Sequence, residues 1–579
     1  MCKTWQWLLA LVACFYCNTL FAQIDLVVDI RGIDTKLEKN ARLYLSLVQQ
    51  KESPLLTEGR LKRLHGQAAQ EIANALKPYG YYRPEISSDL TRSNTGQWQA
   101  TYTVDKGPPL PIAEFRLQLG RNLQQDPAFS RLIADLPLQE GGVFNHLQYE
   151  SIKSDLVRLA SERGYFHARF VQNQVVINLD TYVARVHLYY EGGARYRFGE
   201  VSLQQDVLDP QLLQRYIPFK RGDPYNLNQV IDLQYALNDS DYFSRVEVST
   251  GEVEDTTREV PINVKLTPRK PHRYTLGLGY GTDTGARAKF GWEMPRVNES
   301  GHRISTEAAV SEIGYSLGVR YRIPVLDPRT DQLIYSAGVV NEETDTSEST
   351  LHTLGVALNR SQGQWRESIA LNYQQEEFVI AGDEGDSTLL IPSVDWSRTW
   401  GEGFVNVLDG FRFDIGFRGA SEKLISDTDF FQVQGGLKGI TSVGRDYRLI
   451  ARGRLGSTYT DEFNQLPSSV RFFAGGSQSV RGYAYQSLGP VDSSGRVVGG
   501  KHLMVGSIEL ERSLAGKWGV AVFYDAGNAI DDLDDELEHG AGFGLRWKSP
   551  IGPVRIDVAS ALTQPGEPWR LHINIGPDL

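Results

Sequence analysis

From about residue 273 onward, apolar and polar side chains alternate in short runs. Every second position is apolar in Tyr315–Ile323, Phe411–Phe417 and Val554–Val558, and arginine, aspartate, serine or glycine fills the positions between them. A period of two predicts β-strands with one apolar and one polar face. Such strands suit a barrel whose outer face meets lipid and whose inner face meets water. The alternative is a soluble β-sandwich, in which the apolar face packs on a second sheet.

The predicted connections between these strands differ in length. The short ones are Pro324–Gln332, Ser361–Trp365, Gly444–Asp446 and Ser549–Pro553, and the longer polar ones are Asn341–Thr350, Glu376–Ser387, Ala420–Asp429, Ser457–Gly500 and Asp531–His539. Short periplasmic turns opposite long external loops are typical of bacterial outer-membrane barrels. We count about 16 strands, an even number that returns the C-terminus to the periplasmic side. The sequence therefore predicts an antiparallel transmembrane β-barrel over residues 268–579.

The N-terminal half contains repeats. Gly107–Leu117 aligns without gaps to Gly193–Leu203, a shift of 86 residues (193 − 107). An aromatic pair follows a helical pattern and precedes a strand three times, at Tyr81-Tyr82, Tyr165-Phe166 and Tyr242-Phe243. We interpret these pairs as core packing between helix and sheet. The pattern predicts three α+β units, each with the order strand, helix, helix, strand, strand, over residues 23–106, 107–192 and 193–267.

The first residues have the features of an export signal. Lys3 precedes the apolar run Leu8–Tyr16, and Ala22 provides a small residue for cleavage before Gln23. We therefore expect residues 1–22 to be a cleaved signal peptide, although Leu11–Cys14 also resembles a lipidation signal. All three cysteines lie in this segment, so the mature chain is expected to contain none. No later apolar run is long enough for a spanning helix, which leaves a closed barrel as the membrane-crossing structure.

Composition and motifs exclude several functions. The chain has 60 basic and 71 acidic residues, a net charge of −11 that argues against nucleic-acid binding. We find no Gly-x-Ser-x-Gly motif, no zinc-ligand spacing and no histidine–carboxylate cluster, so we expect neither an enzyme nor a cofactor. The acidic run Asp531–Glu536 lacks EF-hand spacing and suits a solvated loop. A passive porin would leave the N-terminal repeats without a role.

Three motifs in the C-terminal half occur in a fixed order. Val480–Tyr483 (Val-Arg-Gly-Tyr) lies in the longest predicted loop, Phe523–Gly527 follows as Phe-Tyr-Asp-Ala-Gly, and Gly542–Trp547 precedes the closing segment Ser549–Asp557. This set resembles the outer-membrane assembly superfamily, whose best-known members are BamA-like, and the repeats resemble its periplasmic POTRA domains. The first repeat lacks the Gly-x-x-x-x-[Ile/Phe]-[Ala/Gly]-Glu start of the other two. The resemblance covers nearly the whole mature chain.

The resemblance implies an internal clamp. In this family the loop with the Val-Arg-Gly motif folds back into the barrel, so Arg481 would meet Asp525, with Glu509 as a second acceptor. An arginine in a barrel suits a carboxylate that pairs with it through two hydrogen bonds. Gly482 would permit a tight turn and Tyr483 would pack on the inner wall. The predicted clamp, structural rather than catalytic, consists of Val480, Arg481, Gly482, Tyr483, Glu509, Asp525 and Gly527.

A weak seam is predicted where the barrel closes. The first strand is Tyr274–Gly281 and the last is Trp569–Gly576, with glycines in the former and prolines on both sides of the latter. Glycine weakens a strand and proline cannot donate to the ladder, although glycines also relieve crowding in tilted barrels. The family resemblance implies a lateral gate here, and we expect Leu276 to face Ile573. The predicted seam residues are Tyr274, Leu276, Gly277, Gly279, Gly281, Leu571, Ile573, Ile575 and Gly576.

The number of repeats favours one branch of the superfamily. Three repeats resemble the TamA-type outer-membrane subunit of the translocation and assembly module, whereas the BamA type carries five. This resemblance implies an outer-membrane location with periplasmic N-terminal domains, an inner-membrane-anchored TamB-like partner, autotransporter-type client proteins and contact with outer-membrane lipid. A two-partner-secretion transporter and a lipid-delivery component are the alternatives.

Overall fold

The structure is a computed structural model that describes residues 24–253, 255–402, 409–514, 516–549 and 552–575. The predicted signal peptide lies outside the described residues. The chain forms two compact units. One contains residues up to Glu200 together with 219–230 and 250–262, and the other contains 201–218, 231–249 and the chain from 263 onward. Among the helices in the described ranges, none is both long and apolar enough to cross a membrane.

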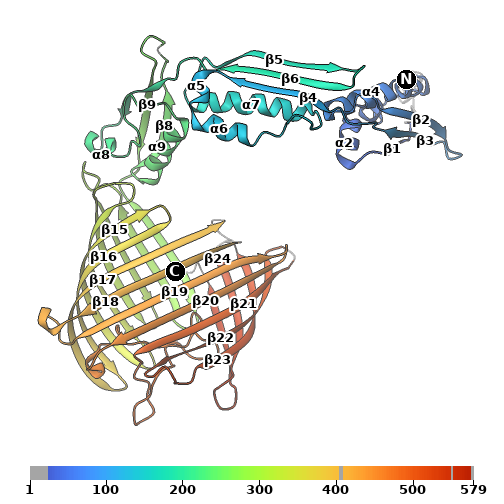
Figure 1. Ribbon diagram of the computed structural model, residues 1–579. Helices are drawn as coiled ribbons and strands as arrows, with labels where there is room; N and C mark the ends of the chain where they lie inside the picture. Colours follow the sequence, from blue (N-terminus) through green and yellow to red (C-terminus); the bar gives the residue numbers. More distant parts are fainter. Residues whose placement is uncertain (1–23, 254, 403–408, 515, 550–551, 576–579) are drawn as a thin grey trace, which may run out of the picture. The chain divides into compact units, whose positions relative to one another are not determined.

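The N-terminal half contains three small sheets, one for each repeat (Figure 1). In each sheet, the last strand of the repeat lies between the other two. In the first two sheets, the opening strand pairs in parallel with the central strand and the remaining strand pairs antiparallel to it. The strand orders are β1 (Leu26–Arg31), β3 (Trp98–Asp105), β2 (Glu85–Arg92); β4 (Ile112–Leu119), β6 (Val183–Glu191), β5 (Arg169–Asn178); and β7 (Arg197–Gln204), β9 (Glu259–Pro268), β8 (Phe243–Thr250).

Helices lie between the first and second strands of each repeat. Alternate residues of β3 and β6 are buried, among them Tyr102 and Tyr190, and they pack with the apolar sides of the helices. Side chains cap several helix starts, as Asp34 does for α2 and Asn145 for α7. The helices are α2 (Thr35–Tyr44), α3 (Ser46–Gln50), α4 (Glu58–Leu76), α5 (Arg121–Gln124), α6 (Pro127–Ala134), α7 (His146–Glu162), α8 (Pro210–Gln214) and α9 (Leu227–Asp239).

The C-terminal half is a closed antiparallel barrel of 16 strands, β10 to β25, in sequence order. This confirms the predicted fold class. Apolar side chains such as Leu276, Leu317 and Val522 are exposed on it, as a lipid-facing surface requires. The strands are β10 (Arg273–Gly281), β11 (Gly285–Met294), β12 (Arg303–Ser311), β13 (Gly314–Pro324), β14 (Gln332–Glu343), β15 (Ser347–Gln362), β16 (Trp365–Ile380), β17 (Asp383–Glu402), β18 (Asp409–Ala420), β19 (Phe430–Val443), β20 (Tyr447–Tyr459), β21 (His502–Ser513), β22 (Trp518–Ile530), β23 (Glu538–Ser549), β24 (Gly552–Ala561) and β25 (Trp569–Ile575).

Two of the predicted long loops are instead paired strands. Glu376–Ser387 continues the β16–β17 ladder up to the pair Ile380 and Asp383, and most of Asn341–Thr350 belongs to β14 and β15. A tilted strand needs only about 10 residues to cross the hydrocarbon layer. The 20 residues of β17 therefore extend well beyond it, where both faces tolerate polar side chains. Polarity alone thus predicted a loop wrongly.

One aromatic pair contacts more than its own repeat. Tyr242 is 1% exposed, and its hydroxyl donates to the carbonyl oxygen of Gly301 at 2.6 Å, in the turn between β11 and β12. Arg303 at the start of β12 lies over the Tyr242 ring at 4.5 Å and also bonds the Ser240 carbonyl oxygen. The backbone N–H of Asp209 donates to the Glu299 carbonyl oxygen at 2.8 Å. The predicted core aromatic therefore also fastens the third repeat to a barrel turn.

Candidate functional site

The connection between β20 and β21, residues 460–501, carries the Val-Arg-Gly-Tyr motif to the inner wall of the barrel. Gly482 adopts a φ of +102°, in the left-handed region that favours glycine. A Cβ atom on Gly482 would lie 2.9 Å from the backbone nitrogen of Ala561, so even the space for a methyl group is lacking. Backbone conformation and close approach to β24 therefore both require glycine at this position.

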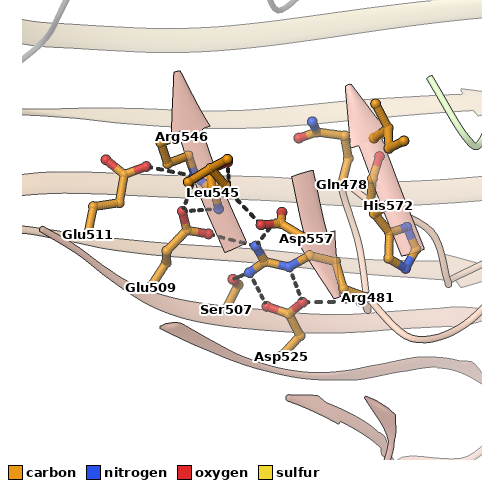
Figure 2. Close-up of polar contacts among 12 residues, drawn as sticks. Gln478, Arg481, Ser507, Glu509, Glu511, Asp525, Leu545, Arg546, Asp557 and His572 are labelled. Carbon is orange, nitrogen blue, oxygen red and sulfur yellow. Dashed lines mark hydrogen bonds and ion pairs between the residues drawn. The ribbon is translucent and has the colours of Figure 1, made fainter. Parts of the chain in front are cut away.

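Arg481 forms the centre of the site (Figure 2). Its Nε donates to Asp525 Oδ2 at 2.7 Å and its Nη2 to Asp525 Oδ1 at 2.9 Å, the two-bond pairing that the family resemblance implied. The Arg481 backbone N–H also donates to Oδ2 at 3.1 Å. Both side chains are buried, with 2% of Arg481 and 0% of Asp525 exposed. The structure therefore holds the arginine in one orientation through its side chain and its backbone.

Further groups complete the surroundings of the guanidinium. Nη1 donates to Glu509 Oε2 at 2.6 Å, the second acceptor that the sequence suggested, and to Asp557 Oδ2 at 3.4 Å. Nη2 also donates to Ser507 Oγ at 3.3 Å. The guanidinium carbon lies 3.3 Å from the centre of the Phe523 ring. Strands β21, β22 and β24 thus all contribute to one arginine that comes from the loop.

A second arginine joins these carboxylates to each other. Arg546 on β23 donates to Glu509 Oε1 through Nη2 at 2.6 Å and to Glu511 Oε1 through Nε at 3.2 Å. It also pairs with Asp557, and Arg448 on β20 bonds Glu511 Oε2 at 2.8 Å. The result is a continuous ion-pair network across the inner faces of β20 to β24. Because removing one partner would leave a buried charge uncompensated, the network stabilises only when it is complete.

The remaining predicted clamp residues are packed around this network. Val480 is fully buried in an apolar cluster with Phe472, Leu488 and Ala561. The Tyr483 hydroxyl donates to Glu538 Oε2 at 2.8 Å and contacts Thr563 Oγ1 at 2.7 Å. A Cβ atom on Gly527 would lie 2.7 Å from the Val505 Cα, so this glycine permits close packing of β22 on β21. All seven predicted clamp residues thus lie within this region of the barrel.

The described part of the seam between the first and last strands contains two residue pairs. Only Tyr280 with Ile575 and Gly281 with Asn574 pair in the described part of the β10–β25 ladder, whereas all nine residues of β10 pair with β11. Beyond the ladder, the Thr282 backbone N–H donates to the Ile573 carbonyl oxygen at 3.0 Å. Ile573 thus lies opposite Thr282, and the expected pairing of Leu276 with Ile573 is wrong.

The predicted seam residues have different surroundings. Tyr274, Leu276 and Leu571 are exposed on the outer surface, and Gly576 lies outside the described residues. A Cβ atom on Gly279 would meet the Ile575 carbonyl oxygen at 2.9 Å, so this glycine relieves crowding at the seam itself. A Cβ atom on Gly277 would have ordinary contacts, with its nearest neighbour, the Lys289 Cβ, 3.6 Å away. The crowding argument therefore holds at Gly279 but not at Gly277.

Several residues of the site were not identified from the sequence. Phe523 and Asp557 occurred within quoted motifs without a role, and Ser507, Glu511, Arg546, His572 and Asp283 were not singled out. The alternation along β21 to β25 gives a signal for the strand residues, because a charged side chain at an inward position needs a partner. Which inward charges meet depends on the strand register, and that register is not visible in any single strand.

Comparison with known proteins supports the same architecture. The model described as the Omp85 superfamily domain matches residues 270–578, the one described as POTRA domain TamA domain 1 matches 27–106, and the POTRA model described as surface antigen variable number repeat matches 196–269. A crystal structure of BamA from Haemophilus ducreyi lacking POTRA domains 1–3 superposes with a TM-score of 0.66 at 18% identity, covering 80% of this chain and 99% of that one. At this identity the likeness shows the fold.

Two curated relatives carry the description outer membrane protein assembly factor BamA. The protein of Neorickettsia risticii is 22% identical over 466 residues, which cover 74% of this chain and 60% of the relative. The protein of Neisseria meningitidis serogroup B is 20% identical over 583 residues, which cover 86% of this chain and 71% of the relative. The barrel is an outer-membrane barrel, and its POTRA domains lie in the periplasm. The superfamily model matches more than half of the chain, and the chain belongs to the Omp85 superfamily.

Proposed function

We propose that this protein is a non-enzymatic insertase or translocase subunit that helps other outer-membrane proteins to assemble through its barrel seam. The observation that carries this proposal is the described part of the β10–β25 ladder, which contains two residue pairs, whereas β10 pairs with β11 along its whole length. Unpaired backbone groups at a strand edge are a template for an incoming strand. A client β-strand could therefore add to the edge of β10 when the seam opens, beside Leu276 and Leu278, which are 83% and 84% exposed.

The ion-pair network supports the same proposal. A moving seam needs a barrel wall that does not collapse when it opens, and the buried pairs of Arg481 and Arg546 brace the inner faces of β20 to β24. The carboxylates that pair with Arg481 belong to β21, β22 and β24, next to the last strand. With these strands held together by ion pairs, opening would be confined to the seam.

The periplasmic repeats favour the TamA type within the superfamily. The structure has three repeat sheets, and the first repeat matches the model of the first TamA POTRA domain at residues 27–106. We therefore infer a TamB-like partner anchored in the inner membrane, and clients of the autotransporter type. Exposed apolar side chains such as Val171 and Val176 on the edge strand β5 offer a surface for such contacts.

Reconstitution tests the proposed activity. The purified protein is placed in lipid vesicles, an unfolded autotransporter barrel is added, and its folding is followed by the change in gel mobility of unheated samples. The account predicts several-fold faster folding than in vesicles with Arg481→Ala protein. Equal rates in empty vesicles and in vesicles with the native protein would overturn the proposal.

A second experiment tests the partner. The full-length protein carries an affinity tag and is captured from detergent-solubilised envelopes, and the captured proteins are identified by mass spectrometry. Recovery of one large inner-membrane-anchored protein is expected, and it should be lost when residues 24–106 are deleted. Recovery of client proteins without any inner-membrane protein would contradict the TamA-type assignment while leaving the insertase proposal standing.

A further inference from the structure

The tip of the internal loop contacts both strands of the seam. Residues 477–482 belong to the connection between β20 and β21, far along the sequence from β10 and β25. They nevertheless bond His572 on β25 and Asp283 in the turn that follows β10. The seam is thus joined by a third segment in addition to its own short ladder.

The contact with the last strand passes through a buried histidine. The Gly482 backbone N–H donates to His572 Nε2 at 2.9 Å, and the His572 side chain is 2% exposed. Because Nε2 accepts this hydrogen bond, the proton of a neutral ring must lie on Nδ1. Nδ1 faces Asp283 Oδ1 at 3.8 Å and has no hydrogen-bond partner among the described residues. His572 therefore has the loop on one side and the first hairpin on the other.

The contact with the first hairpin passes through a carboxylate. Asp283 Oδ2 accepts from the Ser477 backbone N–H at 2.7 Å and from Ser477 Oγ at 2.6 Å. The Asp283 side chain is 14% exposed, so these bonds are largely shielded from water. Two hydrogen bonds to an ionised acceptor are stronger than neutral ones. Asp283 thus ties the β10–β11 turn to the same loop tip that holds β25.

The loop tip is itself anchored. Arg481 lies directly before Gly482 and is held by Asp525, Glu509 and Asp557. At the other end of this segment, Gln478 accepts from Arg452 Nη1 on β20 at 3.3 Å. The segment from Ser477 to Gly482 therefore cannot follow either seam strand outward without disturbing the buried network. The segment is therefore held in place by contacts other than those with the two seam strands.

We propose that Ser477, Gly482, Asp283 and His572 form a staple that holds the seam closed, and that the seam opens only when the loop tip releases one of its two strands. The staple supplies three hydrogen bonds from the loop. The described strands themselves contribute two register pairs and the flanking bonds of Thr282 with Ile573. His572 and Asp283 are positioning residues in this scheme. Their role as a control of client insertion rests on the proposed function, whereas their role in holding the seam does not.

A cysteine pair across the seam tests the staple directly. The Thr282 backbone N–H donates to the Ile573 carbonyl oxygen, so the next pair, Gly281 and Asn574, lies at a non-hydrogen-bonded position. Cα atoms at such positions are typically about 4.5 Å apart. This separation suits a disulfide. Gly281→Cys and Asn574→Cys are introduced into the full chain, and the fraction cross-linked after a brief oxidation in lipid vesicles reports how much of the protein has a closed seam.

His572→Leu and Asp283→Ala are then added to this background, singly and together. Each is expected to reduce the cross-linked fraction several-fold. The two contacts act in series through one loop. The double variant should therefore lose no more cross-linking than the worse single variant. Two independent contacts would instead give losses that add. His352→Leu on β15 and Asp534→Ala in the exposed β22–β23 turn are matched controls and should cross-link like the background. Gel mobility of unheated samples confirms that every variant compared is folded.

Cross-linking as fast as in the background for both single variants would overturn the staple, whatever the effect on client insertion. Additive losses in the double variant would also overturn it, because they would show two unconnected contacts. A third outcome is that both single variants cross-link less, that their losses do not add, and that client folding is unchanged. This outcome would support the staple and contradict the proposed function. The two ideas therefore fail on different measurements.

Discussion

Gly544 and Asp557 lie directly opposite each other on β23 and β24, and a Cβ atom on Gly544 would overlap the Asp557 carboxylate that pairs with Arg546. Four positions earlier on the same strand, a Cβ atom on Gly540 would overlap the backbone oxygen of Arg481. These glycines make the space in which the ion-pair network and the loop lie.

The first prediction follows from this space. Gly544→Ala should destabilise the folded barrel by about 1–3 kcal/mol, because an extra methyl group in a filled site forces its neighbours to move. Gly439→Ala on β19 is the matched control, since a Cβ atom there would have nothing within 4 Å. The free energy of unfolding is measured by urea titration in lipid vesicles. Equal free energies of unfolding for Gly544→Ala and Gly439→Ala would show that the Asp557 carboxylate can move to make room for the added methyl group.

The second prediction concerns the charge of the loop arginine. Arg481→Ala leaves the buried Asp525 without the arginine that pairs with it, while Glu509 and Asp557 keep Arg546. A broken buried pair typically costs about 3–5 kcal/mol. Arg481→Lys should also destabilise the barrel, because an ammonium group cannot make the two-bond pairing with Asp525. Arg412→Ala is the control on the same inner wall. Its guanidinium lies 3.4 Å from Asp414 but is 62% exposed, so a change within about 0.5 kcal/mol is expected.

A third prediction concerns pH and the periplasmic repeats. Burial lowers the pKa of His65 and of His146 from the usual 6.5, although Asp89 and Glu150 respectively act in the opposite direction. Each imidazole contacts a tyrosine hydroxyl, His65 that of Tyr102 at 2.9 Å and His146 that of Tyr82 at 2.7 Å. Below about pH 6.5 the unfolded chain binds protons that the folded repeats exclude. The stability of the repeats should therefore fall as the pH drops from 7.5 to 5.5.

This pH effect is measured on the full-length protein by protease cleavage of the repeats at increasing urea concentration. The urea midpoint should be lower at pH 5.5 than at pH 7.5. In the double variant His65→Gln with His146→Gln, the two midpoints should move closer together. A midpoint that rises on acidification would contradict the assignment of neutral histidines to the folded repeats.

The fold could be predicted from the sequence because its periodicity is local. Alternation in runs such as Phe411–Phe417 identifies a strand without knowledge of its neighbours, and the shift between Gly107 and Gly193 reveals the repeats directly. The turn between β16 and β17 was missed because its two residues, Ala381 and Gly382, both have positive φ but lack the usual asparagine or aspartate signal. A polar ladder that continues beyond the membrane looks like a loop when only polarity is considered.

The candidate site could be predicted only in part. The pairing of Arg481 with Asp525 and Glu509 came from family resemblance, and the structure places these groups in contact. The contributions of Asp557 and His572 depend on the register of the last strands and on where the loop tip lies. Neither can be derived from residue types, because a shift of one residue turns every side chain to the other face.

The central claim is that clients enter the membrane through the β10–β25 seam, and a disulfide across it tests this claim most directly. Protein with Gly281→Cys and Asn574→Cys is reconstituted in lipid vesicles, and the folding rate of an added autotransporter barrel is compared in the oxidised and reduced states. Oxidised protein that carries only Gly281→Cys controls for the oxidant. The account predicts that oxidation of the pair lowers the folding rate to that of empty vesicles and that reduction restores it. Full activity with the seam covalently closed would contradict the account.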